Sequence, residues 1–117
     1  MASDRYFYVY AFLRMDKPGE FIYGDLVFGY EPFYIGKGIN DRIISSLRYE
    51  SGNNNLKRNI INKIHENDME VKSIKIKENL SESEAFLYER EVIECIGKRI
   101  DGVGPLSNLS DGGRGYS

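Results

Sequence analysis

One carboxylate stands where an apolar side chain is expected. Residues 82 to about 98 have the spacing of a helix, and Glu89 lies in the middle of its apolar stripe. The stripe consists of Phe86, Ile93, Ile100, Ile96, Ala85 and Val92. Burying an ionised carboxylate is prohibitive unless it is paired, hydrogen-bonded or bound to a metal. Glu89 is therefore either the partner of an arginine or lysine at the helix edge or a functional carboxylate, most simply a ligand for a hard divalent cation.

Tyrosines gather on two predicted strands. Residues 6–13 are dense in aromatic and β-branched side chains, and residues 33–36 follow Pro32 as a second strand. Antiparallel pairing would give one apolar face and one face of phenols. The apolar face would hold Phe7, Val9, Ala11, Phe33 and Ile35, and the other face Tyr8, Tyr10 and Tyr34. Phenols that share a face are ordinary cross-strand pairs in many sheets, so this pattern alone does not identify a site.

A short helix is predicted over residues 42–48, with Asn40 or Asp41 as its cap. Its buried stripe would be Ile43, Ile44 and Leu47. The opposite face would present Arg42, Ser46 and Tyr49, and a guanidinium there could meet a phosphate.

The remaining elements follow from turn residues and apolar spacing. Residues 15–20 carry turn chemistry, residues 21–31 form a possible extra hairpin arm, and residues 37–40 break the second strand. A second helix carries Leu56, Ile60, Ile61 and Ile64, and a third strand carries Val71, Ile74 and Ile76. Ser81 and Glu84 form a capping box that opens the last helix, and residues 102–105 end regular structure. This order predicts a small α/β sandwich of the α+β kind with an antiparallel sheet.

Composition indicates one domain, residues 1–117, with a single hydrophobic core. No apolar run approaches the roughly 20 residues of a membrane helix, and nothing marks the chain for export, so no membrane association is expected. Cys95 is the only cysteine, which fits a reducing compartment, and we expect the cytoplasm.

Charge is unevenly distributed along the chain. The net charge of −2 argues against a protein that coats nucleic acid by bulk attraction. Residues 37–63 nevertheless hold six basic and two acidic side chains, whereas residues 66–94 hold four basic and nine acidic ones. One interpretation is that the basic segment faces a phosphate backbone while the acidic segment is turned away from it. The alternative is that both segments are solvated helix faces.

The run Tyr8-Val9-Tyr10, then Tyr34-Ile35-Gly36, then Arg42, Glu89 and Asn108 resembles the GIY-YIG nuclease family. The resemblance covers residues 7 to about 113. The short spacing from the Tyr-Ile-Gly-Lys-Gly segment to Arg42 is similar to that of the compact branch, which includes the LEM-domain structure-selective nucleases. It implies a central three-stranded antiparallel sheet flanked by helices. It also implies a DNA endonuclease that uses a single divalent metal, Mg²⁺ or Mn²⁺.

The resemblance assigns roles to individual residues. Tyr10 and Tyr34 would be the two motif tyrosines, Arg42 the arginine that faces the phosphate, and Glu89 the metal ligand. Asn108 would close the site and contact substrate, and Lys37 could add positive charge near the phosphate.

The sequence departs from the family pattern in two places. The first motif reads Tyr-Val-Tyr, so only its last residue matches, and Ser46 stands where many members place a histidine or tyrosine. Tyr49, two turns further on, is the candidate substitute. Two hypotheses follow: a metal-dependent DNA endonuclease, or a module that binds nucleic acid or protein after losing a proton-transfer residue. Since the chain has no room for an appended recognition domain, target choice would need DNA shape, the 21–31 insertion, a homodimer or a separate targeting partner.

Overall fold

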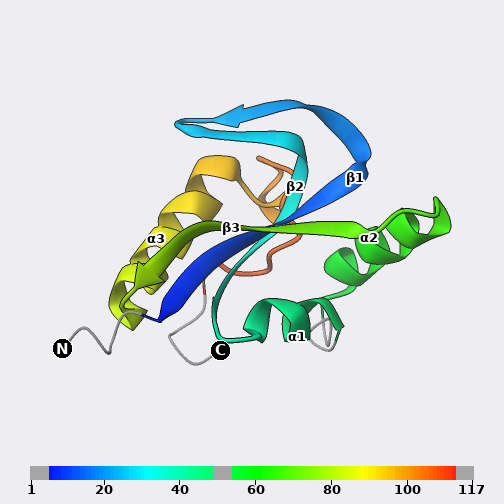
Figure 1. Cartoon of the computed structure of the whole chain (residues 1–117). Helices are drawn as coiled ribbons and strands as arrows, with labels where there is room; N and C mark the ends of the chain where they lie inside the picture. The colour runs from blue at the N-terminus through cyan, green and yellow to red at the C-terminus, as the bar shows by residue number, and fades with distance from the viewer. Residues whose placement is uncertain (1–5, 49–53, 113–117) are drawn as a thin grey trace.

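The computed structural model describes residues 6–48 and 54–112 and contains one antiparallel sheet with helices on both faces (Figure 1). The chain runs through β1 (Phe7–Tyr23), β2 (Leu26–Ile39), α1 (Arg42–Arg48), α2 (Asn55–Glu66), β3 (Val71–Leu80), α3 (Glu82–Ile96) and the short 3₁₀ helix η2 (Arg99–Asp101). The strand order is β2-β1-β3, and both pairings are antiparallel. The predicted α+β class and three-stranded sheet are confirmed.

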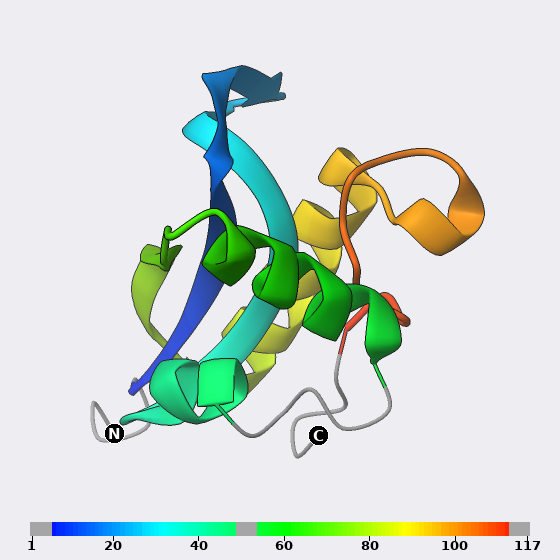
Figure 2. The same cartoon turned by 90° about the vertical axis from the view of Figure 1, so that its right-hand side faces the viewer.

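Each face of the sheet has its own core. On one face, Val9, Ala11, Leu13 and Ile35 pack against Val92, Ile93 and Ile96 of α3. On the other face, Tyr8, Tyr10, Phe12 and Phe33 pack against Ile60, Ile61 and Ile64 of α2. Figure 2 shows α1 and α2 on the near side of the sheet, with α3 behind it.

Phe33 lies on the face opposite to the predicted one. Phe12 pairs with Tyr34, but Leu13 pairs with Pro32, so the register shifts between these two positions of β1. A bulge of this kind leaves one residue unpaired and breaks the alternation of side chains. Phe33 therefore joins the phenol side together with Tyr34.

The predicted turn over residues 15–20 is wrong, because β1 continues through it to Tyr23. The register shifts between Arg14 and Pro18 and again before Phe21, which lets the strand accommodate Pro18 and Gly19. The chain reverses at Gly24 and Asp25, where Gly24 has a φ of +60° that favours glycine. Residues 21–31 do form the predicted arm, and the second strand continues past the predicted break to Ile39.

The helices follow the prediction more closely in their bounds than in their buried faces. α1 has the predicted bounds, but Ile44 is 49% exposed whereas Ser46 is buried. This correction arises because Ser46 faces Lys57 of α2, so the buried face of α1 is polar at this point. α3 opens with the predicted capping box at Ser81 and ends at Ile96, because Gly97 takes a φ of +98°. Ile100 therefore lies beyond α3 and is exposed.

The outer edge of β2 is covered by Ser107 and Asn108. The Asn108 side chain accepts a hydrogen bond from the Ile35 backbone N–H (3.0 Å) and donates one to the Ile35 carbonyl (2.8 Å). The Ser107 hydroxyl and backbone N–H both donate to the Phe33 carbonyl, each at 2.7 Å. The side-chain amide thus replaces a neighbouring strand at the residue next to Tyr34.

Within the described residues, no helix has the length and apolar character needed to cross a membrane.

Asn108→Ala should lower the free energy of unfolding by about 2–4 kcal/mol, because it leaves two buried backbone groups of Ile35 without partners. Urea denaturation measures the change. Asn62→Ala, the same substitution at an exposed position of α2, is the control and should change stability by less than about 0.5 kcal/mol. Equal stability of the two variants would contradict this role of Asn108.

Candidate functional site

Tyr10 lies directly over Gly36, its partner in the β1–β2 ladder. A Cβ atom on Gly36 would overlap the Cζ and Oη atoms of the Tyr10 ring. The ring is only 2% exposed, so it cannot swing aside into solvent. The glycine of the Tyr-Ile-Gly motif is therefore required to seat this phenol against β2.

The Tyr10 phenol is surrounded by polar groups from three other elements. Its pKa is raised above the usual value of 10.0, first by burial, then by Tyr34, and more weakly by Glu89 and Tyr8. A hydrogen bond with Ser46 of α1 acts in the opposite direction but does not outweigh burial. Tyr10 is therefore a neutral phenol near pH 7, within electrostatic range of the Glu89 carboxylate.

Glu89 is buried, as its place in the apolar stripe of α3 predicts, and is 5% exposed. Its helix packs on the face opposite to Tyr10, yet the Glu89 carboxylate still helps to raise the pKa of that phenol. Gly112 adjoins the carboxylate: a Cβ on that residue would stand 3.2 Å from Glu89 Oε1. A side chain at position 112 would therefore crowd the carboxylate oxygen.

Lys57 of α2 is a component of the site that the sequence reasoning missed. It is fully buried, and its ammonium donates to the carbonyl and the hydroxyl of Ser46, each at 3.0 Å. The same ammonium lies 4.0 Å from the centre of the Tyr34 ring, a cation–π contact. Since Ser46 is in the last turn of α1, Lys57 also satisfies a carbonyl at that helix end.

A signal for Lys57 was present in the sequence. Lys57 shares a helical face with Ile60, Ile61 and Ile64, so it is a charge within an apolar stripe, as Glu89 is. Lys57 is therefore detectable from the sequence by the same pattern that marks Glu89.

Tyr8 holds the start of α1 beside the phenols. Its hydroxyl donates to the Asn40 carbonyl at 2.7 Å and accepts from the Ile43 backbone N–H at 3.0 Å. Burial raises the pKa of Tyr8, while nearby Arg42 partly lowers it. The rings of Tyr8 and Tyr10 are 6.0 Å apart. Gly38 lies against both the Tyr8 ring and the Cβ atom of Arg42, which places the start of the Arg42 side chain beside Tyr8.

The structure does not show the other predicted site residues, Lys37, Asn108 and Tyr49, in contact with the Tyr10 phenol. The Lys37 ammonium lies 5.8 Å from the centre of the Phe7 ring, and Lys37 pairs with Val9, whose side chain is on the α3 face. Both polar ends of the Asn108 amide bind Ile35, which makes Asn108 a positioning residue here. Tyr49 lies outside the described residues. Substrate contacts by Lys37, Tyr49 and Asn108 stay predictions.

Gly36→Ala should displace the Tyr10 ring, whereas Gly29→Ala in the same strand should not, because a Cβ at Gly29 meets no atom within 4 Å. We expect Gly36→Ala to shift the NMR signals of the Tyr10 ring and to lower the free energy of unfolding by about 1–3 kcal/mol through overpacking. Equal spectra and equal stability of the two variants would contradict the seating of Tyr10 on Gly36.

Stability should fall at alkaline pH in a manner that depends on Tyr10. Its pKa is higher in the folded chain than the usual 10.0, so its contribution is complete below about pH 10 and is lost as the pH rises further. Urea denaturation between about pH 9 and 12 should show a shallower decline for Tyr10→Phe than for the wild type. Tyr6→Phe, at a position 61% exposed, is the control and should follow the wild type. A wild-type slope in Tyr10→Phe would contradict the raised pKa.

Comparison with known proteins identifies the family. Residues 27–115, more than half of the chain, match the family model described as the LEM-3-like GIY-YIG domain. No curated protein and no solved structure matches the chain. The matched range includes Tyr34, Arg42, Glu89 and Asn108, and the antiparallel sheet with its flanking helices is consistent with the fold of this family. The chain therefore belongs to the GIY-YIG nuclease family, within its LEM-3-like group.

Proposed function

We propose that this protein is a DNA endonuclease that hydrolyses phosphodiester bonds with one divalent cation bound at Glu89. Membership of the family supports nuclease activity in general. The observation that carries the finer proposal is the burial of the Glu89 carboxylate within electrostatic range of the buried Tyr10 phenol. Burial of an ionised carboxylate requires a charged, hydrogen-bonding or metal partner, and the partner in this proposal is a divalent cation.

The residues around Glu89 fit a hard cation held by a single carboxylate. Mg²⁺ keeps several waters and is commonly bound through one or two carboxylates together with substrate phosphates. In residues 6–48 and 54–112, no group of three or more His, Cys, Asp or Glu side chains lies together. A cation bound there would therefore take most of its ligands from water and substrate. When bound, such a cation supplies Lewis-acid stabilisation of the charge that develops on the phosphate.

The protein's own groups would position water and phosphate. In hydrolysis, a water oxygen forms a bond to phosphorus while the bond to the leaving 3′ oxygen breaks. The water gives up a proton and the leaving oxygen takes one up. The neutral Tyr10 phenol would orient that water through a hydrogen bond, since burial disfavours its ionised form. Arg42 would bind a phosphate oxygen through the N–H donors of its guanidinium. Tyr34 and Lys57, stacked on one another, would keep the phenol in place.

A second candidate function is favoured by Ser46. The family commonly has a histidine or tyrosine at this position, and here a serine hydroxyl is hydrogen-bonded to Lys57 and to Tyr10. A serine cannot carry a proton at neutral pH as histidine does. The chain would then be a module that keeps the fold and binds nucleic acid without cutting it.

Incubation with supercoiled plasmid and with a branched DNA, in Mg²⁺, Mn²⁺ or chelator, separates the two functions. Cleavage that depends on the metal supports the endonuclease. Binding without cleavage under every condition supports the binding module and contradicts the endonuclease.

Glu89→Gln should reduce metal-dependent cleavage about 100-fold or more, because several kcal/mol of charge stabilisation depend on the bound cation. Glutamine keeps the shape of the side chain and removes the charge. Glu91→Gln, two residues away on the exposed side of α3, is the matched control and should cleave like the wild type. Circular dichroism confirms that both variants are folded. Wild-type cleavage by Glu89→Gln would contradict the assignment of Glu89 as the metal ligand.

A further inference from the structure

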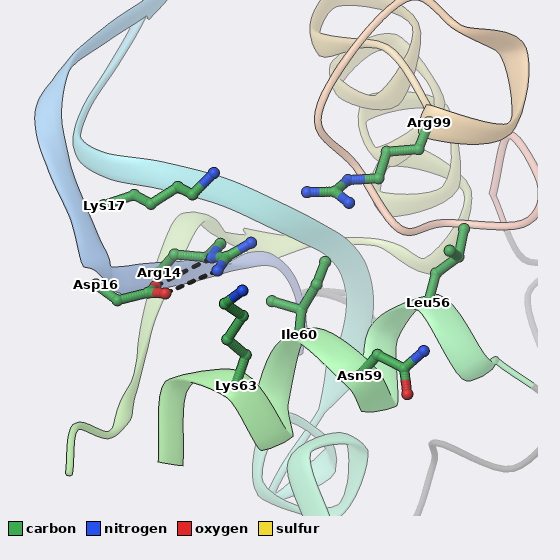
Figure 3. Close-up of a pocket in the computed structure, with 8 residues that line it drawn as sticks. All are labelled: Arg14, Asp16, Lys17, Leu56, Asn59, Ile60, Lys63 and Arg99. Carbon is green, nitrogen blue, oxygen red and sulfur yellow. Dashed lines mark hydrogen bonds and ion pairs between the residues drawn. The ribbon is translucent and has the colours of Figure 1, made fainter. Parts of the chain in front are cut away.

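A cationic pocket of about 400 Å³ lies apart from the phenols, between β1, α2 and η2 (Figure 3). Its charged lining consists of Arg14, Lys17, Lys63 and Arg99, with Asp16 as the single acidic group. Figure 3 shows the four cationic side chains pointing toward a common space from three separate elements. The lining thus carries a formal charge of +3 in a chain whose net charge is −2.

The pocket has a rigid cation at its inner wall. Arg14 is 4% exposed and binds Asp16 through two hydrogen bonds, Nε to Oδ1 at 3.0 Å and Nη2 to Oδ2 at 2.7 Å. The bonds hold the pKa of Asp16 below its usual range and raise that of Arg14, so both stay charged. Arg14 Nη1 takes part in neither bond, and a guanidinium has five N–H donors.

The other three cations stand at the entrance with exposed ends. Arg99 Nε donates to the Pro105 carbonyl at 3.2 Å, which orients this guanidinium. The Lys17 ammonium is 3.9 Å from Glu31, with a side chain that is half exposed, and Lys63 is exposed on α2. Asp16 and Glu31 offset part of the four positive charges. The remaining positive charge favours an anionic ligand.

The chemistry of the lining favours a phosphate group over a whole nucleotide. None of the residues that line this pocket is aromatic, so it offers no ring on which a base could stack. Arginine and lysine donors, together with the amide of Asn59, are the groups that bind phosphate oxygens in protein–DNA complexes.

The position of the pocket relative to the candidate site suits a second phosphate of the same DNA. Tyr10, Phe12 and Arg14 alternate onto the α2 face of β1, and four residues of strand span roughly 13 Å. This separation is comparable to the roughly 12 Å width of the major groove of B-DNA, across which the two backbones face one another.

We propose that this pocket binds a phosphate of the DNA backbone, on the strand or duplex arm that is not being cut. This inference rests on the proposed function, since it takes the phenol site as the place of the scissile phosphate. Binding at two separated phosphates would fix the direction of the DNA across the α2 face. The domain would thereby gain a preference for a DNA geometry.

The test measures DNA affinity in chelator, where metal-dependent cutting does not interfere, with a labelled duplex and a labelled branched junction over a range of salt concentrations. Lys63→Gln and Arg99→Gln should each weaken binding about five- to tenfold near 0.1 M salt and reduce the slope of log K against log salt by about one. In the double variant Lys63→Gln/Arg99→Gln, the two losses of affinity and the two reductions in slope should combine. Lys72→Gln, an exposed charge on β3 outside the pocket, is the matched control for loss of net charge.

The outcomes separate this inference from the proposed function. Weakened binding in the pocket variants, with no cleavage by the wild type in Mg²⁺ or Mn²⁺, supports the pocket while the endonuclease fails. Pocket variants that bind DNA like Lys72→Gln, with an unchanged salt slope, overturn the pocket even if the wild type cleaves. A third outcome is that inorganic phosphate competes with DNA while the pocket variants bind DNA like the wild type. The pocket would then be at most a site for small anions, and this outcome also overturns the proposed DNA contact.

Discussion

Burial of charge around one phenol is the constraint on which the rest of the structure depends. Glu89 and Lys57 are both almost inaccessible to water, and Tyr10 is buried near them. Buried polar groups persist only when they have partners, so each ties its element to another. Lys57 joins α2 to α1 through Ser46, Ser46 joins α1 to Tyr10, and Glu89 of α3 acts electrostatically on the same phenol. The apolar cores supply stability, and these polar groups set how the elements are placed around the phenol.

The edge strand β2 connects this constraint to the remaining features. It carries Tyr34 and Gly36, and its outer backbone groups are bound by Ser107 and Asn108. An edge held by side chains keeps its register without a fourth strand. The segment that supplies these side chains follows η2, whose Arg99 reaches the cationic pocket. One short region of chain thus supports both the phenol site and the proposed contact with a second phosphate.

Much of this arrangement could be predicted from local sequence. The capping box at Ser81, the bounds of α1 and the apolar faces of α2 and α3 follow from helix periodicity, and Glu89 is detectable because it breaks that periodicity. The errors lie where long-range pairing overrides local signals. Pro18 and Gly19 look like a turn, but pairing with β2 carries the strand past them. Phe33 changes face because of a bulge, and the burial of Ser46 depends on Lys57, eleven residues away.

The most direct test of the central claim is the location of a bound divalent cation. Titration of Mn²⁺ into isotope-labelled protein broadens NMR signals according to their distance from the ion. A metal site at Glu89 predicts that the signals of Tyr10, Gly36 and Gly112 broaden first, and that Glu89→Gln abolishes this pattern. Broadening confined to exposed acidic positions such as Glu82 and Asp101, and unchanged in Glu89→Gln, would contradict a metal site at Glu89.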